Sequence, residues 1–153
     1  MYKSASLQPA TLLDSRLKFV VDNIPDTEIR PSATHGNGLF ATRDFAAGEV
    51  IAILDGQIVN WPSYEQIKGT LPYGEDNNDL FMEWNALSAD TLLIRPFRTK
   101  YSFINHGRAA NIQRIDGPLR LITTMAIAAD SELLIDYRDE PLSPEYLQQA
   151  TFL

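Results

Sequence analysis

Most of the side chains that could do chemistry in this sequence lie in three short segments. The segments are HGNGLF (35–40), FINHG (103–107) and SELLIDY (131–137). In the first, Gly36 and Gly38 permit a turn with positive φ or the close approach of a ligand to the backbone. In the second, the amide of Asn105 and the imidazole of His106 suit a metal or cofactor contact, or a hydrogen-bonded buried pair. In the third, Tyr137 ends a strand-like run.

Several familiar kinds of site do not fit these segments. HGNGLF lacks the third glycine and the following helix pattern of a dinucleotide-binding turn, and the sequence has no G-x-S-x-G nucleophile motif. The chain has no cysteine, which excludes disulfides, thiolate zinc sites and cysteine nucleophiles. Two lone histidines far apart in the chain, His35 and His106, are weak evidence for a metal site. We therefore expect no metal.

Charge and composition point to the kind of partner. The formal net charge of −7 repels phosphate backbones, so direct nucleic-acid binding is not expected. A basic protein or peptide fits better, although many proteins are this acidic for solubility alone. The N-terminus, MYKSASLQPATLLD, lacks the apolar core of a signal peptide, and no run approaches 18 apolar residues. We expect a cytoplasmic protein without a membrane segment. Export as an effector stays open, and the oligomeric state is undetermined.

The elements that position the three segments are predicted to be mainly short strands. The 153 residues, of which 44% are hydrophobic, suit one domain with a single core. Strand-like runs fall at TEIR, LFAT, EVIAILDG, LFMEWNAL, TLLIRP, ANIQRI, LRLITTMA and SELLIDY. Turns are expected at 88–90 and 116–118, a short helix over 62–69, and a helix start at Ser143 and Pro144. Residues 11–21 fit either a strand or a helix. Many strands without βα alternation indicate a mostly-β fold.

Taken together, three longer segments resemble the SET-domain protein lysine methyltransferases. The segments are GNGLFATRDFAAGEVIAILDG (36–56), SFINHGRAAN (102–111) and SELLIDY (131–137), in the order and at the spacing of that family. The resemblance extends over about residues 28–138 of a single domain spanning 1–153, and the chain is similar to a minimal bacterial or viral SET module. It implies a SET-domain fold of small curved sheets with a C-terminal pseudoknot. It also implies S-adenosylmethionine-dependent methyl transfer to a lysine amine of a protein or peptide.

The resemblance assigns roles to particular residues. It implies a cofactor site made of Gly36, Asn37, Gly38, Leu39, Asn105, His106 and Tyr137. Tyr137 is the expected catalytic residue, which would orient the methyl group and the lysine nitrogen and stabilise the sulfonium. A phenol of ordinary acidity would be a poor general base. Tyr101 and Trp84 are weaker candidates for the walls of a lysine channel, and plain core packing explains them equally well.

The chain departs from the family pattern at positions that bear on recognition. Leu54 stands where relatives often carry a tyrosine, and Arg108 and Ala110 replace the family's Cys and Pro. A SET-like binding module without strong catalysis, or a SET-fold enzyme with an altered substrate, therefore stays open beside the methyltransferase. Because the chain has no cysteine-rich closing segment, the tail 139–153 is expected to act as a lid that contributes Tyr146 and Phe152. Deleting residues 141–153 should then weaken cofactor binding.

Overall fold

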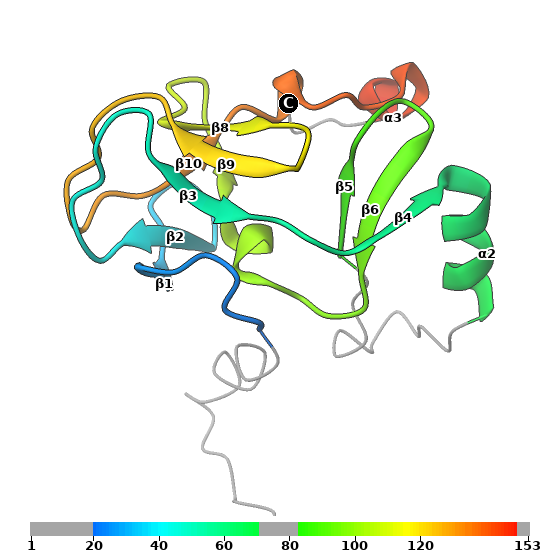
Figure 1. Ribbon diagram of the computed structural model, residues 1–153, viewed down its shortest axis with the longest axis horizontal. Coiled ribbons are helices and arrows are strands. Elements are labelled where there is room, and N and C mark those ends of the chain that lie inside the picture. The colour runs from blue at the N-terminus through cyan, green and yellow to red at the C-terminus, as the bar shows by residue number, and fades with distance from the viewer. Residues whose placement is uncertain (1–19, 71–82, 150–153) are drawn as a thin grey trace, which may run out of the picture.

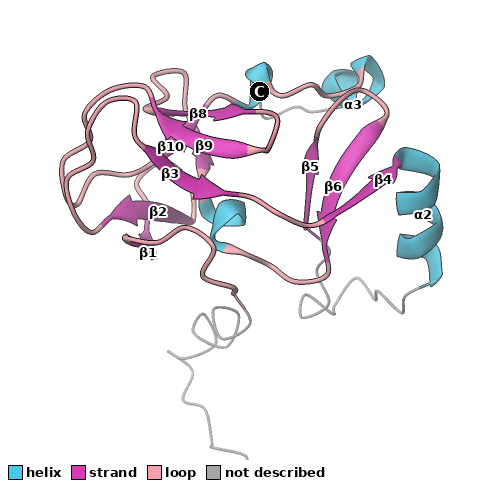
Figure 2. Cartoon of the chain, in the orientation of Figure 1, coloured by secondary structure: helices cyan, strands magenta, loops and turns pink. Residues whose placement is uncertain are grey.

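The computed structural model describes residues 20–70 and 83–149, and strands and loops make up most of them (Figure 2). The strands are β1 Thr27–Pro31, β2 Asn37–Ala41, β3 Val50–Ile53, β4 Gln57–Asn60, β5 Glu83–Ala86, β6 Thr91–Arg95, β7 Asn105–His106, β8 Ile112–Ile115, β9 Arg120–Thr123 and β10 Leu134–Ile135. The helices are α2 Trp61–Thr70 and α3 Pro144–Gln149, with 3₁₀ turns η2 Lys100–Phe103 and η3 Tyr137–Asp139. The predicted mostly-β fold is confirmed. None of the described helices has the length and apolar character needed to cross a membrane.

The strands form four small sheets. Two are three-stranded and antiparallel, in the orders β3-β9-β8 and β4-β6-β5. Figure 1 shows them side by side, with the β1-β2 hairpin near β3 and with α2 beside β4 at the outer edge. The fourth sheet joins β7 to β10 in parallel. It therefore places the FINHG and SELLIDY segments next to each other, as expected for the two parts of the pseudoknot.

Two hydrophobic clusters support these sheets. The larger contains buried residues in or directly after β2, β3, β9 and η2, among them Leu39, Leu54, Leu121 and Ile104. The smaller lies between α2 and the β4-β6-β5 sheet, where Trp61, Tyr64 and Trp84 form edge-to-face ring contacts. The helix begins after Asn60, whose Oδ1 accepts a hydrogen bond from the backbone N–H of Ser63 at 2.9 Å, as an N-cap does.

Most of the local predictions hold within the described ranges. The turn at 88–90 connects the strands of the β5-β6 hairpin, and the turn at 116–118 connects those of the β8-β9 hairpin. Helix α3 begins at Pro144. The helix predicted over 62–69 runs from Trp61 to Thr70, one residue longer at each end. The strand predicted over 131–137 is wrong in extent, because a ladder forms only at Leu134 and Ile135, and Glu132 makes a single isolated bridge with Phe40. Asp136 accepts a hydrogen bond from the N–H of Arg138 and caps η3, which ends the strand. Residues 11–19 lie outside the described ranges.

Candidate functional site

The parallel pairing of β7 with β10 brings two of the three sequence segments together. Leu134 is opposite Asn105, and Ile135 is opposite His106. The N–H of Gly107 donates to the carbonyl of Ile135 at 3.0 Å. A two-residue parallel ladder is weak by itself, so side chains must reinforce it.

Asn111 provides that reinforcement. Its Nδ2 donates to the carbonyl of Glu132 at 2.8 Å, and its Oδ1 accepts from the N–H of Leu134 at 2.8 Å. The side chain therefore pairs with the backbone as a strand would. Asn111 ends the SFINHGRAAN segment, but the sequence alone assigned it no function. Its position six residues after Asn105 was the available signal of a role at the site.

The amide of Asn105 links all three segments. Its Nδ2 lies 3.0 Å from the carbonyl oxygen of His35, 3.3 Å from that of Asn37 and 2.8 Å from Oε1 of Glu132. These contacts fix the orientation of the amide, because both of its N–H groups are directed into the protein. Its Oδ1 consequently points the other way and accepts no hydrogen bond from the described residues.

The carboxylate of Glu132 fixes this arrangement and explains why residue 38 is a glycine. Its carboxylate accepts hydrogen bonds from the hydroxyl of Ser32 at 2.8 and 2.9 Å and from that of Thr34 at 3.3 Å. A Cβ at Gly38 would lie 2.1 Å from Oε1 of Glu132, so the carboxylate fills the space that a side chain would need. We predicted that Gly38 lets a ligand approach the backbone. The structure shows that the Glu132 carboxylate takes this space, and the ligand contact predicted for Gly38 stays a prediction.

Gly36 and Leu39, the two ends of the GNGL stretch, differ in their surroundings. Gly36 has φ of +46°, with open space where a Cβ would stand, so it meets the expectation of a glycine turn. Leu39 has a fully buried side chain, and its carbonyl accepts from the N–H of Leu133 at 2.7 Å. Leu39 is therefore part of the core and does not present its side chain to a ligand, while the backbone of 35–37 faces the Asn105 amide.

His106 is oriented by the segment that carries Tyr137. Its Nδ1 accepts a hydrogen bond from the N–H of Tyr137 at 3.1 Å, so the proton of the neutral ring lies on Nε2. Oδ1 of Asp136 is 3.7 Å from Nδ1. Hydrogen bonds from the Arg138 side chain hold the pKa of the Asp136 carboxyl below its ordinary range, so this group is ionised at neutral pH.

The hydroxyl of Tyr137 is also fixed. It donates to the carbonyl of Ile104 at 2.5 Å, and its ring lies tilted against that of His106 with the centroids 5.4 Å apart. In this contact the phenol is the hydrogen-bond donor, and its proton is directed at Ile104. The oxygen can therefore face a positive charge without giving up its proton.

These residues surround one cavity of about 420 Å³. Thr34, His35, Asn105, His106 and Tyr137 line it. All three sequence segments thus contribute to a space within the roughly 300–1,000 Å³ typical of ligand pockets. Although both histidines line it, the described residues contain no group of three or more His, Asp or Glu side chains arranged to hold a metal ion.

Neither predicted channel residue lines this cavity. The buried hydroxyl of Tyr101 donates to Oε1 of Glu140 at 2.6 Å, and Oε2 of Glu140 pairs with Arg114 at 3.1 Å. Burial raises the pKa of Tyr101 well above its ordinary value. Trp84 lies in the aromatic cluster on α2, 5.2 Å from the ring of Trp61. The structure does not bring Trp84 together with Tyr137.

The predicted lid is only partly described. Glu140 ties the start of the tail to Tyr101, and Leu142 packs on the smaller hydrophobic cluster. No described residue of the tail lines the cavity. The side chain of Tyr146 and the whole of Phe152 lie outside the described part of the chain, so the lid stays a prediction.

Comparison with known families agrees with the three segments. The model of the family described as SET domain matches residues 36–138. This match contains every residue that lines the cavity except Thr34 and His35, which directly precede it. No curated protein matches the chain.

Proposed function

The chain belongs to the SET-domain family, and from that membership we propose that it is an S-adenosylmethionine-dependent methyltransferase acting on a lysine side-chain amine of a protein or peptide. The observation that supports this most is the convergence on one cavity of Asn105, His106 and Tyr137 with His35, which directly precedes the GNG stretch. A protein that used the fold only as a scaffold would not need these polar groups around a cavity.

The groups around the cavity suit the methionine end of S-adenosylmethionine, which carries an ammonium, a carboxylate and a sulfonium. Oδ1 of Asn105 is oriented outward by the contacts of its own Nδ2 and is available to accept from the ammonium. The carbonyls of His35 and Asn37 each have a second lone pair for the same purpose. The Nε2–H of His106 can donate to an acceptor on the ligand.

When bound, the cofactor supplies the reactive methyl carbon. The chain's own residues then provide position and electrostatics. The phenolic oxygen of Tyr137, with its proton held by Ile104, favours positive charge beside it. While that hydrogen bond persists, Tyr137 does not remove a proton from the substrate. The lysine has to arrive as a neutral amine, and desolvation in a narrow apolar channel would shift its pKa in that direction.

The proposal is tested first by calorimetry with S-adenosylhomocysteine and then by transfer of labelled methyl groups to histones and basic peptide arrays. We expect binding, followed by transfer to lysine that Tyr137→Phe abolishes without loss of folding. Tyr64→Phe is the matched control, because Tyr64 lies in the α2 cluster. Transfer that persists in Tyr137→Phe would refute the role of this hydroxyl.

A second candidate function is a SET-like binding module with weak catalysis or none. It is favoured by the hydrogen bonds of Asn105 and Tyr137 to protein carbonyls, which would also serve folding alone. The departures from the family pattern at Leu54, Arg108 and Ala110 also favour a binding module. Failure to bind S-adenosylhomocysteine would favour this candidate, and binding without transfer to any lysine would favour an altered substrate. Under either enzymatic proposal, the charge of −7 suits a basic partner.

A further inference from the structure

Four hydrogen bonds form a closed circuit between the 3₁₀ turns η2 and η3. The hydroxyl of Tyr137 donates to the carbonyl of Ile104 at 2.5 Å, and the N–H of Ile104 donates to the carbonyl of Tyr101 at 3.0 Å. The hydroxyl of Tyr101 donates to Oε1 of Glu140 at 2.6 Å, and the N–H of Glu140 donates to the carbonyl of Tyr137 at 3.2 Å. We refer to these four residues and their hydrogen bonds as the η2-η3 circuit. It therefore holds Tyr137 at its hydroxyl and at its backbone.

Most of the η2-η3 circuit is shielded from water. Tyr101 is 9% exposed and Ile104 1%, and the side chain of Glu140 is 9% exposed. Burial, followed by the Glu140 carboxylate and the Tyr137 phenol, raises the pKa of Tyr101, so Tyr101 keeps its proton and stays the donor. Hydrogen bonds in such surroundings are stronger than in water and polarise one another. Breaking one of the four consequently weakens the others.

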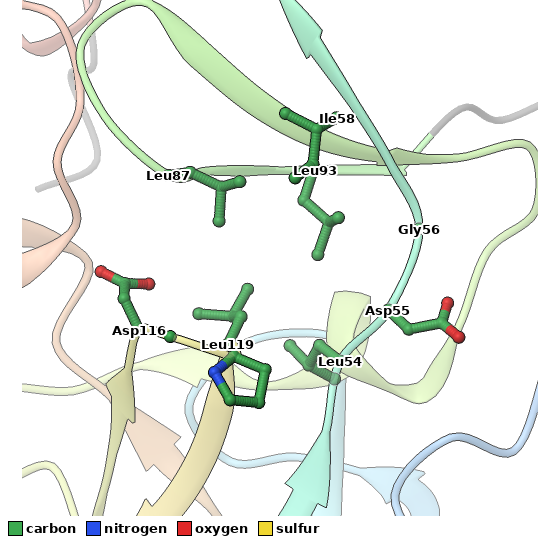
Figure 3. Close-up of a pocket in the computed structure, with 10 residues that line it drawn as sticks. Leu54, Asp55, Gly56, Ile58, Leu87, Leu93, Asp116 and Leu119 are labelled. Carbon is green, nitrogen blue, oxygen red and sulfur yellow. The ribbon is translucent and has the colours of Figure 1, made fainter.

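Arg114 anchors the η2-η3 circuit to β8. Its Nη1 is 3.1 Å from Oε2 of Glu140, and its side chain is only 6% exposed. Its Nη2 donates to the carbonyl of Ala86 and lies 3.2 Å from Oδ1 of Asp116. Figure 3 shows Asp116 at the edge of a separate cavity of about 530 Å³, with its carboxylate pointing away from the leucines that line it. Because Arg114 holds Oε2 of Glu140, Oε1 is left in place for Tyr101.

Nothing in the candidate cofactor site requires these anchors. Tyr101, Arg114 and Glu140 do not line the cavity of about 420 Å³. We propose that Tyr101 and Glu140 are positioning residues, which act through the η2-η3 circuit to hold the phenolic oxygen of Tyr137 where methyl transfer needs it. This role rests on the proposed function. It gives two residues outside the cavity an effect on the rate of that reaction, since a displacement of about 1 Å can cost about a hundredfold in rate.

Tyr101→Phe is the decisive substitution, because it removes the hydroxyl while the aromatic ring still fills its space and Glu140 still pairs with Arg114. With the best substrate from the peptide arrays, kcat should fall at least about tenfold, within the range of about a hundredfold that misplacement can cost. The KM for S-adenosylmethionine and the affinity for S-adenosylhomocysteine should not change, because the residues that line the cavity are untouched.

Two substitutions serve as matched controls and should leave kcat unchanged. Tyr64→Phe removes the hydroxyl of another buried tyrosine, and Asp116→Asn changes the other acid that pairs with Arg114. Glu140→Ala should reproduce the fall in kcat, and its combination with Tyr101→Phe should be no slower than either alone, because both open the same circuit. Where circular dichroism shows that Glu140→Ala does not fold, Tyr101→Phe alone decides.

A second measurement follows the Tyr137 hydroxyl without turnover. The Cζ NMR signal of isotope-labelled tyrosine reports the hydrogen bonding of the phenol, and Tyr137→Phe identifies the signal of Tyr137. Tyr101→Phe should move this signal, and Tyr64→Phe should not.

Three results overturn the positioning role: a signal that Tyr101→Phe does not move, a moved signal with unchanged kcat, or an equal loss of S-adenosylhomocysteine affinity, which shows general disruption. If the wild-type chain transfers no methyl group, it is the proposed function that fails. The NMR signal of Tyr137 alone then supports or overturns the positioning by Tyr101.

Discussion

Replacing Gly38 by alanine tests the link between the Glu132 carboxylate and the candidate site. The new Cβ would lie 2.1 Å from Oε1 and 2.8 Å from Cδ of Glu132, distances that no real Cβ tolerates. The carboxylate has to leave, because Gly38 itself is held in β2 opposite Arg30. Its departure removes the hydrogen bonds from Ser32 and Asn105.

The size of the effect follows from those two hydrogen bonds. Each involves a charged acceptor and is worth about 1.5–3 kcal/mol. Glu132 is half-buried, so the displaced carboxylate regains water, and we expect a total loss near the lower limit, about 2–3 kcal/mol of unfolding free energy. For a chain of this size that corresponds to a fall in Tm of roughly 4–12 °C. Since Asn105 also loses an anchor, the affinity for S-adenosylhomocysteine should fall about tenfold.

A double-mutant cycle in urea distinguishes this account from a general intolerance of alanine. In a Glu132→Ala background the obstructing carboxylate is gone, so Gly38→Ala should then cost less than about 1 kcal/mol. Gly36→Ala is the control: its cost, about 1–2 kcal/mol from the positive φ, should be the same in both backgrounds. An equal cost of Gly38→Ala with and without Glu132 would refute the reasoning.

Three further substitutions test buried or hydrogen-bonded charges. Glu83→Ala leaves the buried guanidinium of Arg95 without its ion-pair partner and should cost about 3–5 kcal/mol in urea denaturation, more than Glu83→Ala combined with Arg95→Met. Tyr101 has a raised pKa when folded, so its contribution to stability is present below pH of about 10 and lost above it. Tyr101→Phe should therefore make alkaline unfolding less steep, and an unchanged profile would contradict this. Asp136 has a lowered pKa, so its contribution is present above about pH 4 and lost in acid. Asp136→Asn should flatten the fall in Tm between about pH 5 and 2.

The sequence predicted the features that depend on local pattern. Alternation and turn residues located the hairpins at 88–90 and 116–118, because side-chain period and turn chemistry are local properties. The relation between FINHG and SELLIDY came only from resemblance to a family. A parallel pair of two residues between segments this far apart leaves no periodicity to read. Its reinforcement comes from Asn111, whose contacts with the backbone of SELLIDY no local pattern indicates.

Trp84 and Tyr101 show why the channel prediction could not be decided from the sequence. Each is an aromatic residue in a strand-like or apolar context, and that context is the same for a cavity wall and for a packed core. Which of the two applies depends on the partner: Trp61 from α2 contacts Trp84, and Glu140 from the tail accepts from Tyr101. Both partners are distant in sequence, so neither the type of the residue nor its neighbours in the chain carries the information.

Gly38 and Glu132 extend this point to the site itself. A glycine in GNG is usually explained by what it allows a ligand to do, and nothing in the sequence opposes that explanation. The structure shows that a carboxylate from the SELLIDY segment fills the space, and that the same carboxylate holds the amide of Asn105. The glycine, the acid and the amide are therefore one unit, and each is required because the others are present. A family pattern records such a unit as three separate motifs, and the coupling between them becomes visible only when the side chains are placed.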